Sequence, residues 1–174
     1  MAHKIQHSDH ITVGHHGTSH AQACAIVRDS FKLPPPGTES YLGVGVYFFE
    51  NQISNAKRWA FRRHGQTRGT TVAVIQSKIR CGRMLDLTER DLYDTVNWFA
   101  REFERKARQK ASLAAIIDIA ADQLGAEVVR AVRVPKNAAF LLGTGFSTDI
   151  EIILAVRELK NILSSEMIWS GMKV

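Results

Sequence analysis

The chain has 174 residues, of which 45% are hydrophobic and 23% are charged, so its composition is that of a folded protein and not of a disordered one. No run approaches the roughly 18 apolar residues of a membrane-spanning helix, and the N-terminus lacks the apolar stretch of a secretory signal. We therefore expect a cytoplasmic protein without membrane contact, with one domain over residues 11–174 after a polar leader over residues 1–10. Cys24 and Cys81 are too few for a disulfide framework and are expected to be buried.

The net charge of +6 is unevenly distributed along the chain. Residues 1–83 contain 11 Lys and Arg against 4 Asp and Glu, whereas residues 84–174 contain 12 against 13. Every charged residue between Glu50 and Asp86 is basic. This distribution indicates either a polyanionic partner or a solvated basic face. Six of the seven histidines lie in the first twenty residues, but they match no familiar ligand pattern, and we expect no bound metal.

The first elements expected along the chain are a short strand over residues 11–14 and a helix from Ser19. The buried side of this helix is expected to hold Ala23, Ile26 and Val27. Residues 32–42 (KLPPPGTESYL) contain three prolines and a glycine. Neither regular element accommodates this composition, so the segment predicts a loop.

A second strand is expected over residues 44–49. Ser54 is predicted to cap a short helix that Gly65 ends. Residues 71–79 are rich in β-branched side chains and predict a buried strand, which a short strand over residues 84–87 follows.

The middle of the chain predicts two helices. Thr88 is expected to cap the first, Ser112 to begin the second, and Gly125 to lie just beyond its end. Their apolar positions recur at helical spacing: Leu92, Val96, Phe99, Phe103 and Ala107 in the first, and Leu113, Ile116, Ile117, Ala120 and Leu124 in the second, where they are expected to be buried. Strands over residues 128–134 and 150–156 complete the order of elements, which predicts an α+β fold.

Three short segments, taken in order, carry the functional signal: residues 16–18 (HGT), 42–48 (LGVGVYF) and 149–154 (DIEIIL). Together they resemble the motifs of the ADP-ribosyltransferase superfamily, in the His-Tyr-Glu branch of diphtheria toxin and the poly(ADP-ribose) polymerases. The resemblance covers residues 11–157 and implies one ADP-ribosyltransferase-like domain with a split, antiparallel-rich β core and flanking helices. Without a separate regulatory module, the chain is most similar to the small bacterial toxins and defence effectors of that superfamily.

The resemblance implies that NAD+ is the co-substrate and that His16, Tyr47 and Glu151 form the catalytic set. His16 would hydrogen-bond a ribose, Tyr47 would stack on the nicotinamide ring, and Glu151 would stabilise the positive charge that develops on the ribose. Gly17 would complete the NAD+ site through its backbone groups, and Thr18 through its hydroxyl.

For three of these positions the residues alone leave a structural alternative open. Trp59 follows the second motif and is either a second aromatic wall for nicotinamide or a core residue. His16 is either a ligand for ribose or a strand-end side chain that caps the next helix. Glu151 is either the catalytic carboxylate or an exposed strand residue beside Asp149.

The acceptor is predicted from charge. Arg58, Arg62 and Arg63 alternate with aromatic residues, a pattern that suits a phosphate backbone and stacked bases. In the superfamily, the loop before the catalytic strand meets the acceptor, which implies contacts from Phe146 and Thr148. We therefore favour nucleic acid, RNA or DNA, over protein as the acceptor. An antitoxin or other neutralising protein is a further partner that the resemblance implies.

Other functions remain open on the sequence. An NAD+ glycohydrolase would use water as the acceptor, and an RNA 2′-phosphotransferase would pass a phosphate to NAD+ on the same fold. The latter needs no catalytic glutamate, so Glu151 argues against it. The non-enzymatic alternative is a nucleic-acid-binding domain with a degenerate NAD+ site.

Overall fold

The computed structural model describes residues 5–35, 38, 40–135 and 149–172. Over these residues the chain forms six strands, four α-helices and one short 3₁₀ helix. In chain order they are β1 (His7–Ser19), α1 (His20–Asp29), β2 (Val46–Glu50), α2 (Ile53–His64), β3 (Thr71–Asp86), α3 (Arg90–Ala107), α4 (Leu113–Leu124), β4 (Val128–Arg133), β5 (Glu151–Val156), η1 (Leu159–Asn161) and β6 (Ile162–Met172). None of the described helices is long and apolar enough to cross a membrane.

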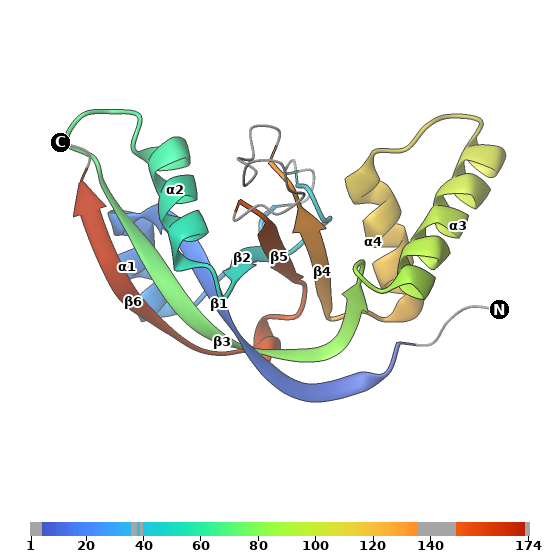
Figure 1. Cartoon of the computed structure of the whole chain (residues 1–174), viewed down its shortest axis with the longest axis horizontal. Helices are drawn as coiled ribbons and strands as arrows, with labels where there is room; N and C mark the ends of the chain where they lie inside the picture. Colours follow the sequence, from blue (N-terminus) through green and yellow to red (C-terminus); the bar gives the residue numbers. More distant parts are fainter. Residues whose placement is uncertain (1–4, 36–37, 39, 136–148, 173–174) are drawn as a thin grey trace, which may run out of the picture.

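The strands form a sheet that divides into two halves (Figure 1). In one half, β3 lies between β1 and β6 and is antiparallel to both. In the other half, β5 lies between β2 and β4 and is again antiparallel to both. The halves join where β1 pairs with β2 at Gly14 and His15, and where the end of β3 pairs in parallel with β4 at residues 84–86. This topology confirms the predicted α+β class with a split, antiparallel-rich sheet.

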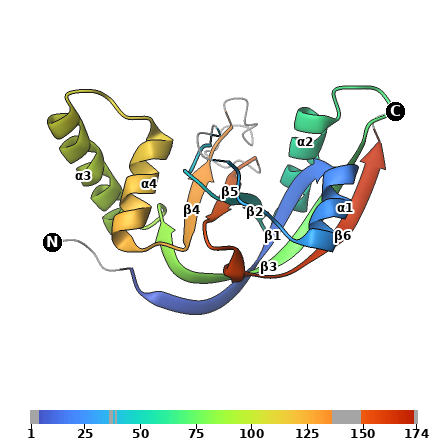
Figure 2. The same ribbon diagram turned by 180° about the vertical axis from the view of Figure 1, so that it is seen from behind.

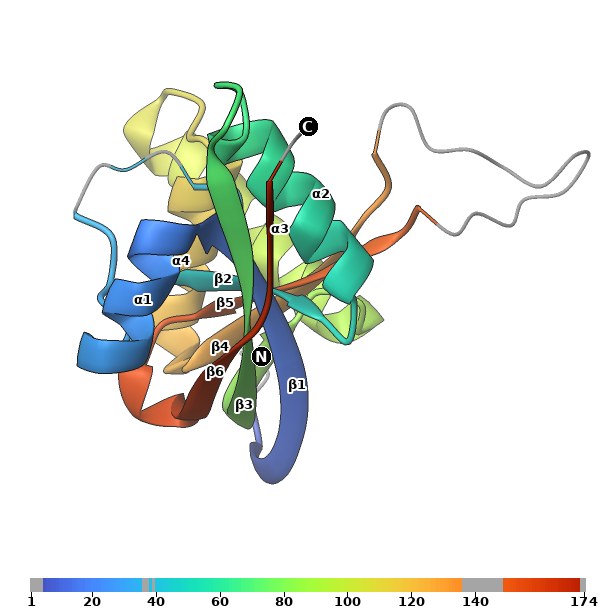
Figure 3. The same cartoon turned by 90° about the vertical axis from the view of Figure 1, so that its left-hand side faces the viewer.

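Helices α1 and α2 cover the half of the sheet that contains β3. They lie on its opposite faces, as the edge-on view in Figure 3 shows, and each is in the foreground of one of the two opposed views in Figures 1 and 2. Ala73 and Ile75 of β3 belong to the apolar cluster that holds Ala23 of α1, whereas Val74 belongs to the cluster that holds Ala56 of α2. Alternate side chains of β3 thus supply two cores, which explains the uninterrupted apolar run over residues 72–75.

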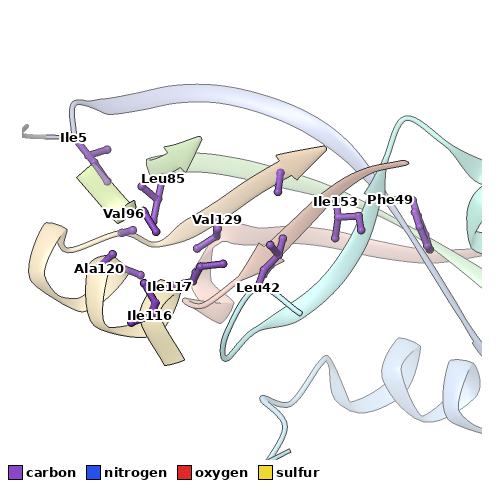
Figure 4. Packing of buried hydrophobic residues seen from close by; sticks show 14 of the residues in the cluster. Ile5, Leu42, Phe49, Leu85, Val96, Ile116, Ile117, Ala120, Val129 and Ile153 are labelled. Carbon is purple, nitrogen blue, oxygen red and sulfur yellow. The ribbon is translucent and has the colours of Figure 1, made fainter. Parts of the chain in front are cut away.

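Helices α3 and α4 pack against each other and complete the core that contains Val74 and Ala56. In Figure 4, Ile117 and Ala120 of α4 lie beside Leu85 of β3 and Val129 of β4. All four side chains are fully buried. The helical spacing that the sequence shows in this region therefore reports real packing against the sheet.

Local end signals predicted two helices correctly. Ser19 accepts a hydrogen bond from Gln22 N at 3.3 Å at the start of α1. Ser112 accepts one from Ala115 N at 3.2 Å at the start of α4, and Gly125 ends that helix in the left-handed conformation. Each signal acts within four residues, so the sequence alone determines it.

Two predicted caps are wrong. α2 begins at Ile53, one residue before Ser54, and its N-cap is Gln52. α3 follows Glu89 rather than Thr88. The Thr88 hydroxyl instead donates to a carboxylate at the end of β3 at 2.7 Å, because the chain turns there before the helix starts.

Two of the described strands, β1 and β3, extend further than predicted. Ile5 is buried and β1 begins at His7, paired with β3, so the polar leader is shorter than residues 1–10. The two strands expected over residues 71–79 and 84–87 form the single strand β3. β6 has no counterpart among the predicted elements.

Three predicted burials are wrong. Val27 and Leu113 are 49% and 55% exposed, and Cys24 is exposed, whereas Cys81 is buried as expected. α1 meets the core through Ala23, so Val27 lies further round the helix and faces solvent. Leu113 is the first residue of α4 and precedes the turn that packs on the sheet.

A buried ionic cluster holds the two halves of the sheet together. Arg130 of β4 donates to Glu50 of β2 at 2.7 Å and to Asp86 of β3 at 2.9 Å. Thr12 of β1 donates to the second oxygen of Glu50 at 2.9 Å. These side chains join four strands, and the carboxylates are almost fully buried. Removal of Arg130 would leave Glu50 and Asp86 buried without their counter-charge, so loss of this arginine should strongly destabilise the fold.

Candidate active site

Two adjoining pockets open where the halves of the sheet diverge. β1 pairs with β2 at Gly14 and His15 and then continues along β3, while β2 continues along β5. The larger pocket, of about 440 Å³, lies under α1 and the segment that follows it. The smaller pocket, of about 250 Å³, lies between β2, α2 and the ends of β4 and β5. Residues His16, Ser40 and Tyr47 line both pockets.

His16 is held as a neutral hydrogen-bond acceptor. Its Nδ1 lies 2.8 Å from Tyr47 O. A carbonyl oxygen can only accept, so we assign the proton to Nδ1. Burial lowers the pKa of His16, more than the hydrogen bond to Tyr47 raises it. The imidazole is therefore neutral near pH 7, and Nε2 is left to accept a hydrogen bond from a ligand hydroxyl. Edge-on contacts with Phe31 and Phe48 fix the ring.

Gly17 and Thr18 continue β1 past His16. A Cβ on Gly17 would stand 2.0 Å from Ala56 O of α2, so the glycine allows this helix to pack directly on the strand. Gly17 also lines the smaller pocket. Thr18 lines the larger pocket, and its hydroxyl donates to Gln22 Oε1 at 2.6 Å. Both residues thus lie at the predicted site, and Gly17 has a packing role that the motif did not indicate.

The ring of Tyr47 is fixed between the two pockets. Its hydroxyl donates to Gly43 O at 2.8 Å and accepts from Leu42 N at 2.6 Å. Burial raises the pKa of Tyr47, so the phenol stays neutral. Residues 42–44, which bond the Tyr47 hydroxyl, are held in turn by Asp118 of α4, which accepts a hydrogen bond from Val44 N at 2.8 Å. The glycine-rich motif therefore serves to orient this tyrosine.

Trp59 of α2 lines the smaller pocket together with Tyr47. It is 37% exposed and packs edge-on against Phe49 at 6.4 Å, so it is a pocket wall and not a core residue. The guanidinium of Arg62 lies 5.9 Å from the centre of its ring. The two aromatic residues that the motifs predicted near nicotinamide are thus brought to one pocket.

Glu151, the first residue of β5, is only 4% exposed, which excludes the alternative of an exposed strand residue. Its carboxylate accepts from Arg133 Nε at 2.7 Å and is also ion-paired with Arg133 Nη2. Arg133 lines the smaller pocket, and its guanidinium lies 5.5 Å from the ring centre of Tyr41. Glu151 is therefore held next to the smaller pocket by Arg133, a pocket-lining residue that the sequence did not single out.

Side-chain hydrogen bonds connect the start of α2 to the start of β5, the strand that carries Glu151. Gln52 donates from Nε2 to Ile150 O at 2.7 Å and accepts from Ile152 N at 2.9 Å. Further along the helix, Arg58 is ion-paired with Asp149 at 3.2 Å. Gln52 occupies the N-cap position of α2, but its side chain makes no capping hydrogen bond to that helix and instead bonds the backbone at the start of β5. Sequence patterns gave no signal for this role.

The predicted acceptor residues lie in different surroundings. Arg62 and Arg63 are exposed on α2, close to the pocket wall. Arg58 is also exposed, but Asp149 and Asn55 bind its guanidinium, so it is a structural contact as well as a surface charge. Phe146 and Thr148 lie outside the described residues. Over the described part of the chain, no three His, Cys, Asp or Glu side chains gather as a metal site.

Comparison of this sequence with protein-family models and with curated proteins finds no match.

Proposed function

We propose that the protein is an NAD+-dependent mono-ADP-ribosyltransferase that modifies a macromolecule, with nucleic acid favoured over protein. The observation that carries this proposal is the convergence of five motif-predicted residues on one pair of pockets: His16, Gly17, Thr18, Tyr47 and Trp59. Two adjoining pockets with one shared wall suit a dinucleotide, which carries a ring system at each end. Glu151 is held beside the smaller of them through Arg133.

The smaller pocket suits the nicotinamide end. Tyr47 and Trp59 offer aromatic faces to a planar cationic ring, and the neutral His16 offers Nε2 to a ribose hydroxyl. In the larger pocket, Thr18 and Lys32 supply a hydroxyl and a positive charge for the adenosine and phosphate groups. These residues offer aromatic, hydroxyl and cationic contacts to the corresponding parts of NAD+.

The proposed reaction breaks the bond between the ribose C1 and the nicotinamide nitrogen, and nicotinamide leaves as a neutral molecule with the bonding electron pair. The ribose carbon becomes positively charged in the transition state. Glu151 supplies a fixed negative charge close to that centre, at lower cost than water, which would have to reorient. A nucleophilic atom of the acceptor then bonds to C1 and releases its proton.

The preference for nucleic acid rests on the charge around the smaller pocket. Arg62 and Arg63 project from the helix that also carries Trp59, and residues 51–85 contain no acidic side chain. Positive charge beside an exposed aromatic wall suits a phosphate backbone and stacked bases. This surface adjoins the pocket proposed for the reacting ribose.

The proposal is tested by incubating the protein with NAD+ radiolabelled in the adenylate phosphate, together with total RNA, single-stranded DNA or lysate protein. We expect nuclease-sensitive label in nucleic acid, and no label with Glu151→Gln. Label that only protease removes would contradict the nucleic-acid preference while supporting the transferase. Nicotinamide release without any label would indicate a glycohydrolase, and loss of a 2′-phosphate from RNA a phosphotransferase. Absence of NAD+ turnover with every acceptor would contradict an enzyme.

A further inference from the structure

The surroundings of Glu151 contain two restraints that the three motifs do not predict. The antiparallel register of β4 and β5 sets Arg133 directly opposite Glu151. Both Nε and Nη2 of Arg133 contact the same carboxylate oxygen, Oε2, so two nitrogens of the planar guanidinium hold it and not one. Two contacts from one rigid, planar group restrain the position of that oxygen more than a single contact would.

The backbone of Glu151 is restrained from the other side. Gln52 bonds the carbonyl of the preceding residue at 2.7 Å and the amide of the following residue at 2.9 Å. A single side-chain amide thus acts as a short partner strand across Glu151. Asn55 adds a contact to Gln52 Oε1 at 3.0 Å. These bonds fix Glu151 relative to the helix that carries Trp59.

We infer that Arg133 and Gln52 are the positioning residues of this site: Gln52 fixes the backbone of Glu151, and Arg133 fixes its carboxylate. The inference rests on the proposed function. A carboxylate that is 4% exposed is costly without a counter-charge. Catalysis also needs that group to be held within about 0.5 Å of its working position. Tyr41 packs against the guanidinium and restrains Arg133 in turn.

The test compares kcat and the KM for NAD+, measured from nicotinamide release, in Arg133→Gln, Arg133→Lys and Gln52→Ala. We expect kcat to fall about 10- to 100-fold in Arg133→Gln, with KM changed less than about threefold, because orientation and not NAD+ binding is lost. Arg133→Lys keeps the charge without the planar guanidinium and should recover part of kcat. Gln52→Ala should lower kcat about tenfold.

Arg83→Gln is the matched control. Arg83 is also paired with a buried glutamate, Glu127, but it lines neither pocket. Its kcat should stay within about twofold of the wild type. Circular dichroism and urea unfolding identify any variant that fails to fold. If Arg133→Gln is such a variant, folded Arg133→Lys decides the question: a lowered kcat supports the positioning role, and a wild-type kcat overturns it.

The inference is overturned if folded Arg133→Gln keeps the wild-type kcat, or if Arg83→Gln loses as much activity. These outcomes differ from a failure of the proposed function, in which the wild type releases no nicotinamide or Glu151→Gln remains fully active. An inactive Glu151→Gln with an active Arg133→Gln would contradict the positioning role alone.

Discussion

Replacement of Gly17 by alanine should disturb both the packing of α2 and the pocket that this helix helps to form. The added Cβ would stand 2.0 Å from Ala56 O and 3.1 Å from Ala60 Cβ, whereas ordinary contacts begin near 3.4 Å. The helix must therefore withdraw by roughly 1.4 Å, the difference between 3.4 and 2.0 Å. Overpacking of this kind costs about 1–3 kcal/mol. Because α2 carries Trp59, a shift of this size should also lower kcat at least tenfold, roughly.

Urea unfolding and nicotinamide release measure the two effects of Gly17→Ala. Gly69→Ala provides the control, since its φ of +85° is strained for alanine but no atom lies within 4 Å of the added Cβ. It should cost about 1 kcal/mol through the backbone alone and leave kcat unchanged. A Gly17→Ala protein as stable as the wild type, within about 0.5 kcal/mol, and equally active would refute the close approach of α2.

Three further predictions follow from the structure. Burial lowers the pKa of His16 below the usual 6.5, so as the pH falls the imidazole is protonated in the unfolded chain before it is protonated in the folded one. The contribution of neutral His16 to the free energy of unfolding is therefore complete above about pH 6.5. Below that pH it is lost by up to about 1.4 kcal/mol per pH unit. Urea unfolding from pH 7.5 to 5 should show a shallower decline in His16→Asn. Arg130→Met should cost about 3–5 kcal/mol by isolating two buried carboxylates, whereas Arg90→Met, at an exposed pair, should cost less than about 1 kcal/mol in the same assay. Arg62→Gln with Arg63→Gln should reduce label transfer to nucleic acid about tenfold while nicotinamide release without acceptor is unchanged; equal loss in both would contradict an acceptor surface.

Part of the fold is predictable from the sequence because its signals are local. Ser112 and Gly125 mark the ends of α4 within one helical turn, and the apolar spacing between them reports its buried face. The sequence predicts two strands over residues 71–79 and 84–87, whereas the structure forms the single strand β3, which passes through Gly82 at a φ of +56°. On one side of this glycine β3 is paired with β1, and beyond it residues 84–86 of β3 are paired with β4. No local sequence pattern indicates this change of partner.

β6 was missed for a related reason. It is paired with β3, and its sequence mixes polar and apolar residues without the β-branched run of a central strand. Its apolar residues, such as Trp169, pack only in part against the core. An edge strand of this kind takes its conformation from its neighbour, so its own residues indicate it weakly.

The candidate site divides in the same way. The motifs predicted His16, Tyr47 and Trp59, and the structure brings them together at one pocket. Arg133 and Gln52 were not predicted, because each acts on Glu151 through tertiary contacts across neighbouring elements. Only the register of β4 and β5, which the sequence does not state, would have pointed to Arg133.

A crystal structure with a non-hydrolysable NAD+ analogue tests the central claim most directly. The account predicts the nicotinamide ring between Tyr47 and Trp59, a ribose hydroxyl within hydrogen-bond distance of His16 Nε2, and the reacting ribose beside Glu151. An analogue bound away from these residues, or no binding at millimolar concentration, would contradict the proposed NAD+ site.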